Sequence, residues 1–138
     1  MTFLKPIIFV SLFIYALNAK DINPNYTYLA SGGVTDIVLR ENKLYVATKS
    51  SKVDIFNTKT KEKTNSITLP KIKDFMGDEI DAKIYSVDVL NDSVLILSQG
   101  SKGGRAINIY KNSKLKEIIS AKEKMYIARA KFISEDKI

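Results

Sequence analysis

The sequence contains no cysteine, no histidine and no tryptophan, and only three prolines among its 138 residues. Without cysteine the chain can form no disulfide, no covalent haem attachment, no zinc site with cysteine ligands and no thiol nucleophile. Without histidine it cannot build a Ser-His-Asp triad. Its stability must therefore come from packing and hydrogen bonding rather than from covalent cross-links.

The charge balance is basic, with 22 Lys+Arg against 15 Asp+Glu and a formal net charge of +7. Hydrophobic residues make up 45% of the chain, which is enough for a packed core, and the length suits about one domain. Excess positive charge can indicate a nucleic-acid or acidic-lipid partner. Here the lysines are scattered over every segment, so a solvated surface is the favoured interpretation. A cationic patch for an anionic ligand is the alternative, and no nucleic-acid partner is expected.

The first residues have the pattern of an export signal. Lys5 precedes an apolar run, residues 7–17, and the small residue Ala19 follows. This order predicts a secretory signal peptide over residues 1–19, cleaved between Ala19 and Lys20. The apolar run is shorter than the ~20 residues that a membrane-spanning helix needs, although an uncleaved anchor is an alternative. The mature chain is expected in the periplasm, with no stable membrane span.

The rest of the chain repeats. Residues 35–48 align with residues 85–98 without a gap, so the period is 50 residues, and residues 132–138 align with residues 38–44 as the start of a third copy. Each full copy reads as an apolar run, a polar turn and a second apolar run. This period in β-patterned sequence predicts the blades of a propeller. The predicted fold is an all-β, WD40-like β-propeller with about two and a half four-stranded blades and an incomplete ring.

The repeat divides the mature chain into a lead-in segment, two full blades joined by an acidic connector, and the start of a third blade. Residues 26–30 are predicted as a strand that could close the ring, residues 121–124 as a turn or brief helix, and residues 125–134 as the opening strand of the third blade. In chain order the parts are residues 20–33, 34–70, 71–83, 84–120 and 121–138. The predicted strands of the full blades are residues 34–39, 43–48, 52–57 and 64–69, then 84–90, 93–98, 106–110 and 115–120.

Two stretches depart from the repeat and are the candidate contact sites. The connector is acidic and is interpreted as a structural loop, with a calcium site as the alternative because calcium takes oxygen ligands. Its apolar pair, Phe75 and Met76, either contacts a partner or covers the edge of a blade. Residues 100–104 are a glycine-rich insertion without P-loop spacing, and loops of this kind often carry function. The residues predicted to contact a partner are Asp74, Phe75, Met76, Asp78, Glu79, Asp81, Lys102 and Arg105.

Four polar residues fall within or near predicted inner strands. Asp54 and Asn108 occupy equivalent positions in the third strands of the two blades, and Asp36 and Asp88 lie in the first strands. We interpret all four as residues that cap turns or bond backbone groups. No catalytic, cofactor-binding or metal-ligating residue is predicted, and no cofactor is expected.

One family resemblance supports this interpretation. The unit at residues 34–70, and above all the sequence Asp-Phe-Met-Gly-Asp-Glu-Ile at residues 74–80 followed by Lys-Ile-Tyr-Ser-Val-Asp at residues 83–88, resembles the NapL family. Those proteins are WD40-like periplasmic accessory proteins of periplasmic nitrate reductase systems. Family members are longer, and the WD dipeptide is missing here because the chain has no tryptophan. The resemblance implies an N-terminal fragment of a soluble, non-enzymatic propeller.

The expected function is therefore that of a non-enzymatic periplasmic interaction or accessory protein, with partners among components of a periplasmic nitrate reductase system. The alternative from another class is an extracytoplasmic ligand-binding or enzymatic propeller whose site needs further blades. A third hypothesis is a binder of anionic polymers through lysine, whose affinity would fall steeply with salt.

Overall fold

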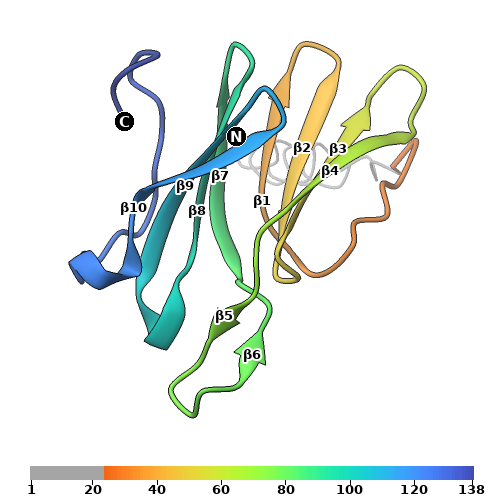
Figure 1. Ribbon diagram of the computed structural model, residues 1–138. Coiled ribbons are helices and arrows are strands. Elements are labelled where there is room, and N and C mark those ends of the chain that lie inside the picture. The colour runs from red at the N-terminus through yellow and green to blue at the C-terminus, as the bar shows by residue number, and fades with distance from the viewer. Residues whose placement is uncertain (1–23) are drawn as a thin grey trace, which may run out of the picture.

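The computed structural model describes residues 24–138, which form an all-β structure with no α-helix in that range (Figure 1). Three antiparallel sheets are present in this part of the chain, and none of them closes on itself. The predicted all-β class is confirmed. The predicted signal peptide, with Ala19 and Lys20 at its cleavage site, lies outside the described residues.

The first sheet is an antiparallel meander of four strands in the order β1-β2-β3-β4. Its inner strand β2 is buried along most of its length, whereas the outer strand β4 is almost entirely exposed and polar. A strand buried on both faces needs apolar residues on both, and an outer strand does not. The strands are β1 (Val34–Arg40), β2 (Lys43–Thr48), β3 (Lys52–Asn57) and β4 (Lys63–Thr68).

The second sheet repeats this arrangement, with neighbours in the order β7-β8-β9-β10. A two-stranded hairpin connects the two sheets and extends below both of them in Figure 1. All eight predicted strands are confirmed, with ends that differ by no more than one residue. The strands are β7 (Ile84–Leu90), β8 (Ser93–Gln99), β9 (Arg105–Lys111) and β10 (Lys114–Ile119), and those of the hairpin are β5 (Ile72–Lys73) and β6 (Glu79–Ile80).

The sequence repeat is also a repeat of strand register. The pairing of β1 with β2 is interrupted between Val34 and Asp36, and that of β7 with β8 is interrupted at the equivalent place. The two-residue turns that follow have a first residue of positive φ, 51° at both Glu41 and Asn91. A third two-residue turn forms at residues 135–136, between the bridged residues Ser134 and Lys137, but its first residue, Glu135, does not have a positive φ. The third copy therefore keeps the position of the turn and the pairing of the residues that flank it, but not the backbone conformation of the turn.

The two large sheets pack face to face through the core of the protein. The first sheet contributes one face, the back face, formed by Val38, Tyr45, Ala47, Val53 and Ile55. The second sheet contributes the opposite face, its front face, formed by Val87, Val89, Val94 and Ile96. The contact therefore joins unlike faces, since the back face of the first sheet packs on the front face of the second.

The back face of the second sheet is covered by the chain that follows it. Leu95, Leu97 and Ile107 are buried there with Ala130, and Phe132 packs against them. The front face of the first sheet is covered over β3, where Phe56 is buried against Tyr28. Over β1 this face is open. Ile37 and Leu39 are 59% and 57% exposed, whereas Val87 and Val89 at the same repeat positions are 0% and 3% exposed.

Polar side chains link the first strand of each unit to the next unit. Asp36 Oδ2 accepts a hydrogen bond from the Val87 amide at 3.0 Å. In the second sheet Ser86 Oγ accepts from the Ala130 amide at 3.3 Å, and Asp88 Oδ2 accepts from the Phe132 amide at 2.9 Å. Neighbouring sheets share no ladder, so these carboxylates and hydroxyl satisfy amides that would otherwise lack a partner. The prediction that Asp36 and Asp88 bond backbone groups is confirmed.

The predicted strand at residues 26–30 is not formed, because no described strand lies beside it to complete a ladder. The segment instead crosses the first sheet through side-chain contacts. The Tyr26 hydroxyl donates to the Lys61 carbonyl at 3.1 Å, and the Tyr28 ring lies 5.2 Å from that of Phe56. Ser31 ends the segment at the buried carboxylate of Asp54.

The predicted strand at residues 125–134 is also wrong. Apart from the single bridge at Ser134, these residues form no ladder. They pack on the second sheet by their side chains and by the hydrogen bonds that the Ala130 and Phe132 amides donate to Ser86 and Asp88. The brief helix expected before them is present as the 3₁₀ turn η2 (Ala121–Glu123), capped by Ser120.

Candidate binding surface

The connector predicted as an acidic loop is the hairpin β5–β6, and Asp74 shapes its turn. Asp74 Oδ1 accepts hydrogen bonds from the amides of Met76 and Asp78 at 2.8 and 3.0 Å, and the Asp74 amide donates to the Asp78 carbonyl at 3.0 Å. Gly77 completes the turn with φ of 95°, a value that L residues rarely adopt. Asp74 is therefore a turn-forming residue, and its carboxylate is turned toward the hairpin's own backbone.

The hairpin presents two large apolar side chains at its tip. Phe75 is 78% exposed and Met76 is 86% exposed. Side chains this exposed favour the interpretation as partner contacts over the covering of a blade edge.

The hairpin contacts the glycine-rich loop, so the structure brings the two predicted contact regions together. The Lys73 amide donates to Ser101 Oγ at 3.4 Å. The Phe75 ring lies so close to Gly103 that a Cβ at Gly103 would be 3.1 Å from Phe75 Cε2. The loop itself forms the 3₁₀ turn η1 (Ser101–Gly103).

The acidic residues beyond Asp74 do not converge. Asp78, Glu79 and Asp81 are exposed, and residues 24–138 contain no group of three acidic side chains arranged to hold a metal ion. The calcium alternative therefore gains no support from the geometry of the described connector.

Arg105, at the start of β9, is held in a fixed orientation. Its guanidinium carbon lies 4.0 Å from the centroid of the Tyr85 ring and 5.7 Å from that of Tyr126, and its Nη1 donates to the Gly103 carbonyl at 3.4 Å. Its Nε is buried and has no hydrogen-bond partner among the described residues. Arg105 is thus a planar cation clamped on an aromatic face.

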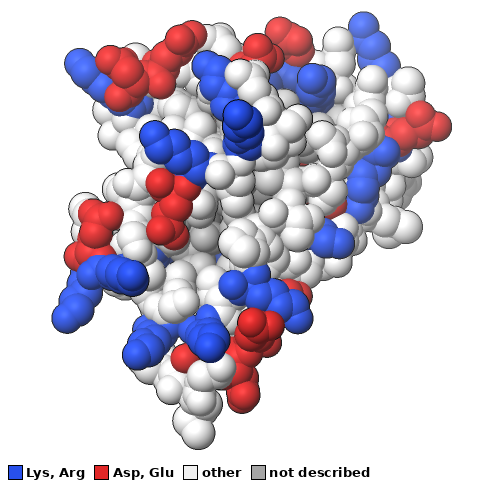
Figure 2. Space-filling model, in the orientation of Figure 1, with Lys and Arg blue, Asp and Glu red and all other residues white. Residues whose placement is uncertain are grey.

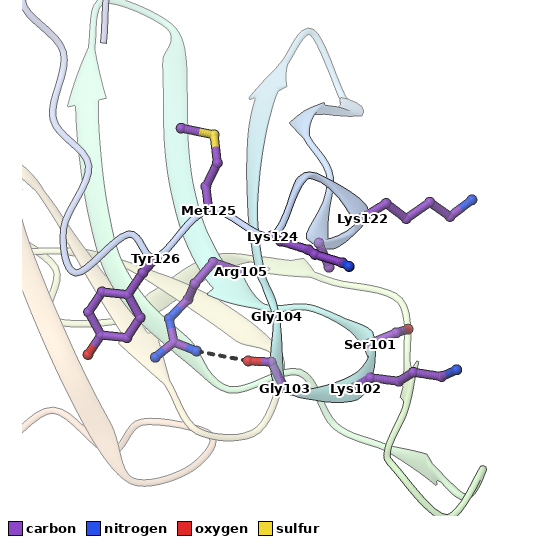
Figure 3. A pocket seen from close by; sticks show the side chains of 10 residues that line it. Ser101, Lys102, Gly103, Gly104, Arg105, Lys122, Lys124, Met125 and Tyr126 are labelled. Atoms are coloured by element: carbon purple, nitrogen blue, oxygen red, sulfur yellow. Dashed lines mark hydrogen bonds between the residues drawn. The ribbon is translucent and has the colours of Figure 1, made fainter.

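A cavity of about 580 Å³ lies beside Arg105, between the glycine-rich loop and η2 (Figure 3). The loop and η2 approach each other closely at Gly104 and Ala121. A Cβ added at Gly104 would lie only 2.8 Å from the Cβ of Ala121. Among the described residues, the lining includes four cations and no acidic side chain. The lining residues are Ser101, Lys102, Gly103, Gly104, Arg105, Ala121, Lys122, Lys124, Met125 and Tyr126.

Sequence reasoning identified part of this cavity. Lys102 and Arg105 were predicted as contact residues and both line it. Lys122, Lys124 and Tyr126 were missed, because residues 121–124 were interpreted only as a turn or brief helix and residues 125–134 only as the opening strand of a third unit. The Lys-Glu-Lys sequence at residues 122–124 could have indicated a local group of cations. Its position beside Arg105 depends on the fold.

The surface charge is otherwise mixed. Figure 2 shows Lys and Arg in several separate groups with Asp and Glu between them, and several of the basic groups lie over the lower left of this face. Figure 1 places η2 and the loop between β8 and β9 there. This distribution favours local cationic sites over one continuous basic face.

Comparison with models of known protein families found no match, and a search of curated proteins found no similar protein. Within residues 24–138 there is no helix of the length and apolar character needed to cross a membrane.

The turn geometry leads to a local prediction for Asp74→Ala. Loss of the two bonds from the amides of Met76 and Asp78 should cost about 1 kcal/mol of local stability. Hydrogen exchange of these amides should become about fivefold faster, with little change in global unfolding. The control is Asp81→Ala, which removes an exposed carboxylate from the same connector. Unchanged exchange in Asp74→Ala would contradict the assigned role of Asp74.

Proposed function

We propose that this chain is a propeller-type, non-enzymatic protein of the periplasm that binds protein partners. The observation that carries the proposal is the exposed pair Phe75 and Met76 on a hairpin fixed by Asp74. Aromatic and methionine side chains are enriched where proteins bind one another, and a fixed turn reduces the entropy lost on binding.

The proposal of a propeller is supported by the way in which successive units pack, unlike face against unlike face. The back face of the first sheet contacts the front face of the second, and the start of the third unit lies on the back face of the second. Repeated contacts between unlike faces generate a ring if the rotation closes. The exposed front-face residues Ile37 and Leu39 are then the place where a preceding blade would pack.

The resemblance to the NapL family suggests the partner class, components of a periplasmic nitrate reductase system. Export fits this class, since the predicted signal peptide would deliver the mature chain to the periplasm. The hairpin that would contact the partner contains the sequence at residues 74–80 that carries the resemblance.

Calorimetric titration of the purified chain with the periplasmic nitrate reductase components of the same organism tests the proposal. We expect measurable binding that Phe75→Ala/Met76→Ala weakens at least tenfold, as is usual for central apolar contact residues. The matched control is Leu29→Ala/Ile133→Ala, which removes side chains that are 81% and 79% exposed elsewhere. The absence of binding would refute the partner class, and equal weakening by both double variants would refute the hairpin surface.

A further inference from the structure

We propose that the cavity between the glycine-rich loop and η2 binds an acidic peptide segment through the carboxylates of its side chains. The inference rests on the proposed function to the extent that it names the chemistry of a protein partner, whose acidic segment would lie next to the hairpin tip. It is carried by the charge and shape of the cavity.

The charge of the lining selects an anion. The cavity is lined by Lys102, Arg105, Lys122 and Lys124, and none of its described lining residues is acidic. The nearest carboxylate along the chain, Glu123, is bound through its Oε1 to the Ser120 amide at 2.9 Å. An anion in the cavity would therefore meet no competing carboxylate among the described lining residues.

Arg105 favours a carboxylate as the anionic group. Its guanidinium lies over the Tyr85 ring and donates to a single acceptor of residues 24–138, the Gly103 carbonyl, while its Nε is buried without an acceptor. A planar guanidinium matches the two oxygens of a carboxylate in a bidentate pair. A lysine at this position would lose that match.

The geometry is less suited to a single phosphate group. Phosphate loops direct several free backbone amides at one point. In this loop the Gly100 amide donates to the Gly104 carbonyl at 2.9 Å, and the Gly104 amide donates to the Ser101 carbonyl at 3.3 Å, so both are already engaged. In Figure 3 the three lysine side chains extend away from Arg105, which lies beside Tyr126. Cations spread in this way fit several carboxylates along a chain.

The cavity also offers apolar contact beside its charges. Met125 and Tyr126 line it and are 48% and 87% exposed. Its volume of about 580 Å³ falls within the range of ligand pockets, roughly 300–1,000 Å³. An apolar side chain between two acidic ones could pack on Met125 while its neighbours reach the cations.

Fluorescence anisotropy of the full chain with a labelled peptide of about ten residues, rich in Glu with one central Phe, tests the inference. We expect binding at low salt that weakens at physiological ionic strength, because exposed charges are screened. Replacing every Glu of the peptide by Gln should abolish binding. Arg105→Gln and Lys122→Gln/Lys124→Gln should each weaken it at least tenfold, and Arg105→Lys should give an intermediate loss.

The matched control is Lys111→Gln/Lys114→Gln, which removes two exposed cations from the turn between β9 and β10, at the other end of β9 from the cavity. The proposal is overturned if this control weakens binding as much as the cavity variants, if the Gln peptide binds equally, or if inorganic phosphate displaces the peptide at equimolar concentration. Lys122→Gln/Lys124→Gln changes exposed side chains only, so it remains informative if Arg105→Gln does not fold.

Peptide binding and binding of the reductase components test the cavity and the proposed partner class separately. The protein could bind no nitrate reductase component and still bind the peptide, even with Phe75→Ala/Met76→Ala. That outcome would support the cavity as a peptide site and refute the proposed partner class. Binding of the reductase components that is unaffected by the cavity variants, together with no peptide binding, would refute the cavity alone.

Discussion

Val87→Asp should abolish cooperative folding, whereas Ile37→Asp at the same position of the repeat should change the free energy of unfolding by no more than about 1 kcal/mol. Val87 is 0% exposed between the two large sheets, and Ile37 is 59% exposed. A carboxylate at residue 87 would replace a fully buried apolar side chain and would lie near Asp36, whose own carboxylate accepts from the Val87 amide. An uncompensated buried charge costs several kcal/mol.

Urea unfolding of both variants, monitored by circular dichroism, measures the difference. If Val87→Asp yields no folded protein, Val87→Ala keeps the comparison quantitative, with an expected loss of about 2 kcal/mol against less than about 0.5 kcal/mol for Ile37→Ala. Equal losses at the two positions would mean that another sheet, or a second copy of the chain, covers the front face of the first sheet in solution. That outcome would contradict the exposure of Ile37 and Leu39 on this face.

The regular strands could be predicted because two signals agree at each of them. β8 has apolar side chains at consecutive positions, as a strand buried on both faces requires, and its turn from β7 has the same place in the repeat as the turn from β1. The role of Asp36 and Asp88 was also accessible, since a polar residue in an apolar strand needs a partner.

The elements that sequence reasoning missed depend on what lies beside them. Residues 26–30 and 125–134 have strand composition, but a strand exists only where another strand completes its ladder, and neither segment has such a neighbour in the described chain. The strands β5 and β6 have two residues each, which is too short for any alternation to show. Their pairing of Ile72 with Ile80 is visible only in the structure.

The candidate site was predicted in its parts and not as a whole. Phe75, Met76, Lys102 and Arg105 were selected because their segments depart from the repeat, and all four lie on the hairpin, the loop or the adjoining start of β9. That Lys122 and Lys124 join them follows from the packing of Ala121 against Gly104. Contacts between segments this far apart in sequence are a tertiary property that no local pattern contains.

Asp54→Ala should lower the free energy of unfolding by about 3 kcal/mol, since a hydrogen bond to a charged group contributes about 1.5–3 kcal/mol and several such bonds are lost at once. Asp54 is fully buried. Its carboxylate accepts from the Ser31 amide at 2.5 Å, from Ser31 Oγ at 2.9 Å and from Ser66 Oγ at 3.1 Å, and it pairs with Lys63 Nζ at 3.1 Å. It thus joins the lead-in segment to the outer strand β4.

Asn108 provides the matched control. It occupies the position in β9 that Asp54 occupies in β3, opposite Ile96 where Asp54 is opposite Val46, and it is also buried. No hydrogen bond of its side chain is found among the described residues, so Asn108→Ala should cost no more than about 1 kcal/mol. Urea unfolding compares the two, and hydrogen exchange of the Ser31 amide should accelerate in Asp54→Ala alone. Equal losses would show that the bonds to Asp54 add nothing to stability.

Asp54 also makes the stability of the protein depend on pH. Burial alone would raise the pKa of the Asp54 carboxyl, but the hydrogen bonds from Ser31, Lys63 and Ser66 favour the charged form more strongly, and the pKa lies below its ordinary value of 3.8. A carboxyl whose pKa is lowered by folding stabilises the protein above its unfolded pKa. That contribution is lost as the pH falls from about 4 through the lowered folded pKa. In Asp54→Asn, which cannot titrate, this part of the acid-induced loss of stability should be missing, so the unfolding free energies of the two proteins should converge as the pH is lowered. A constant difference between them from neutral pH down to strongly acidic pH would show that another carboxyl is responsible.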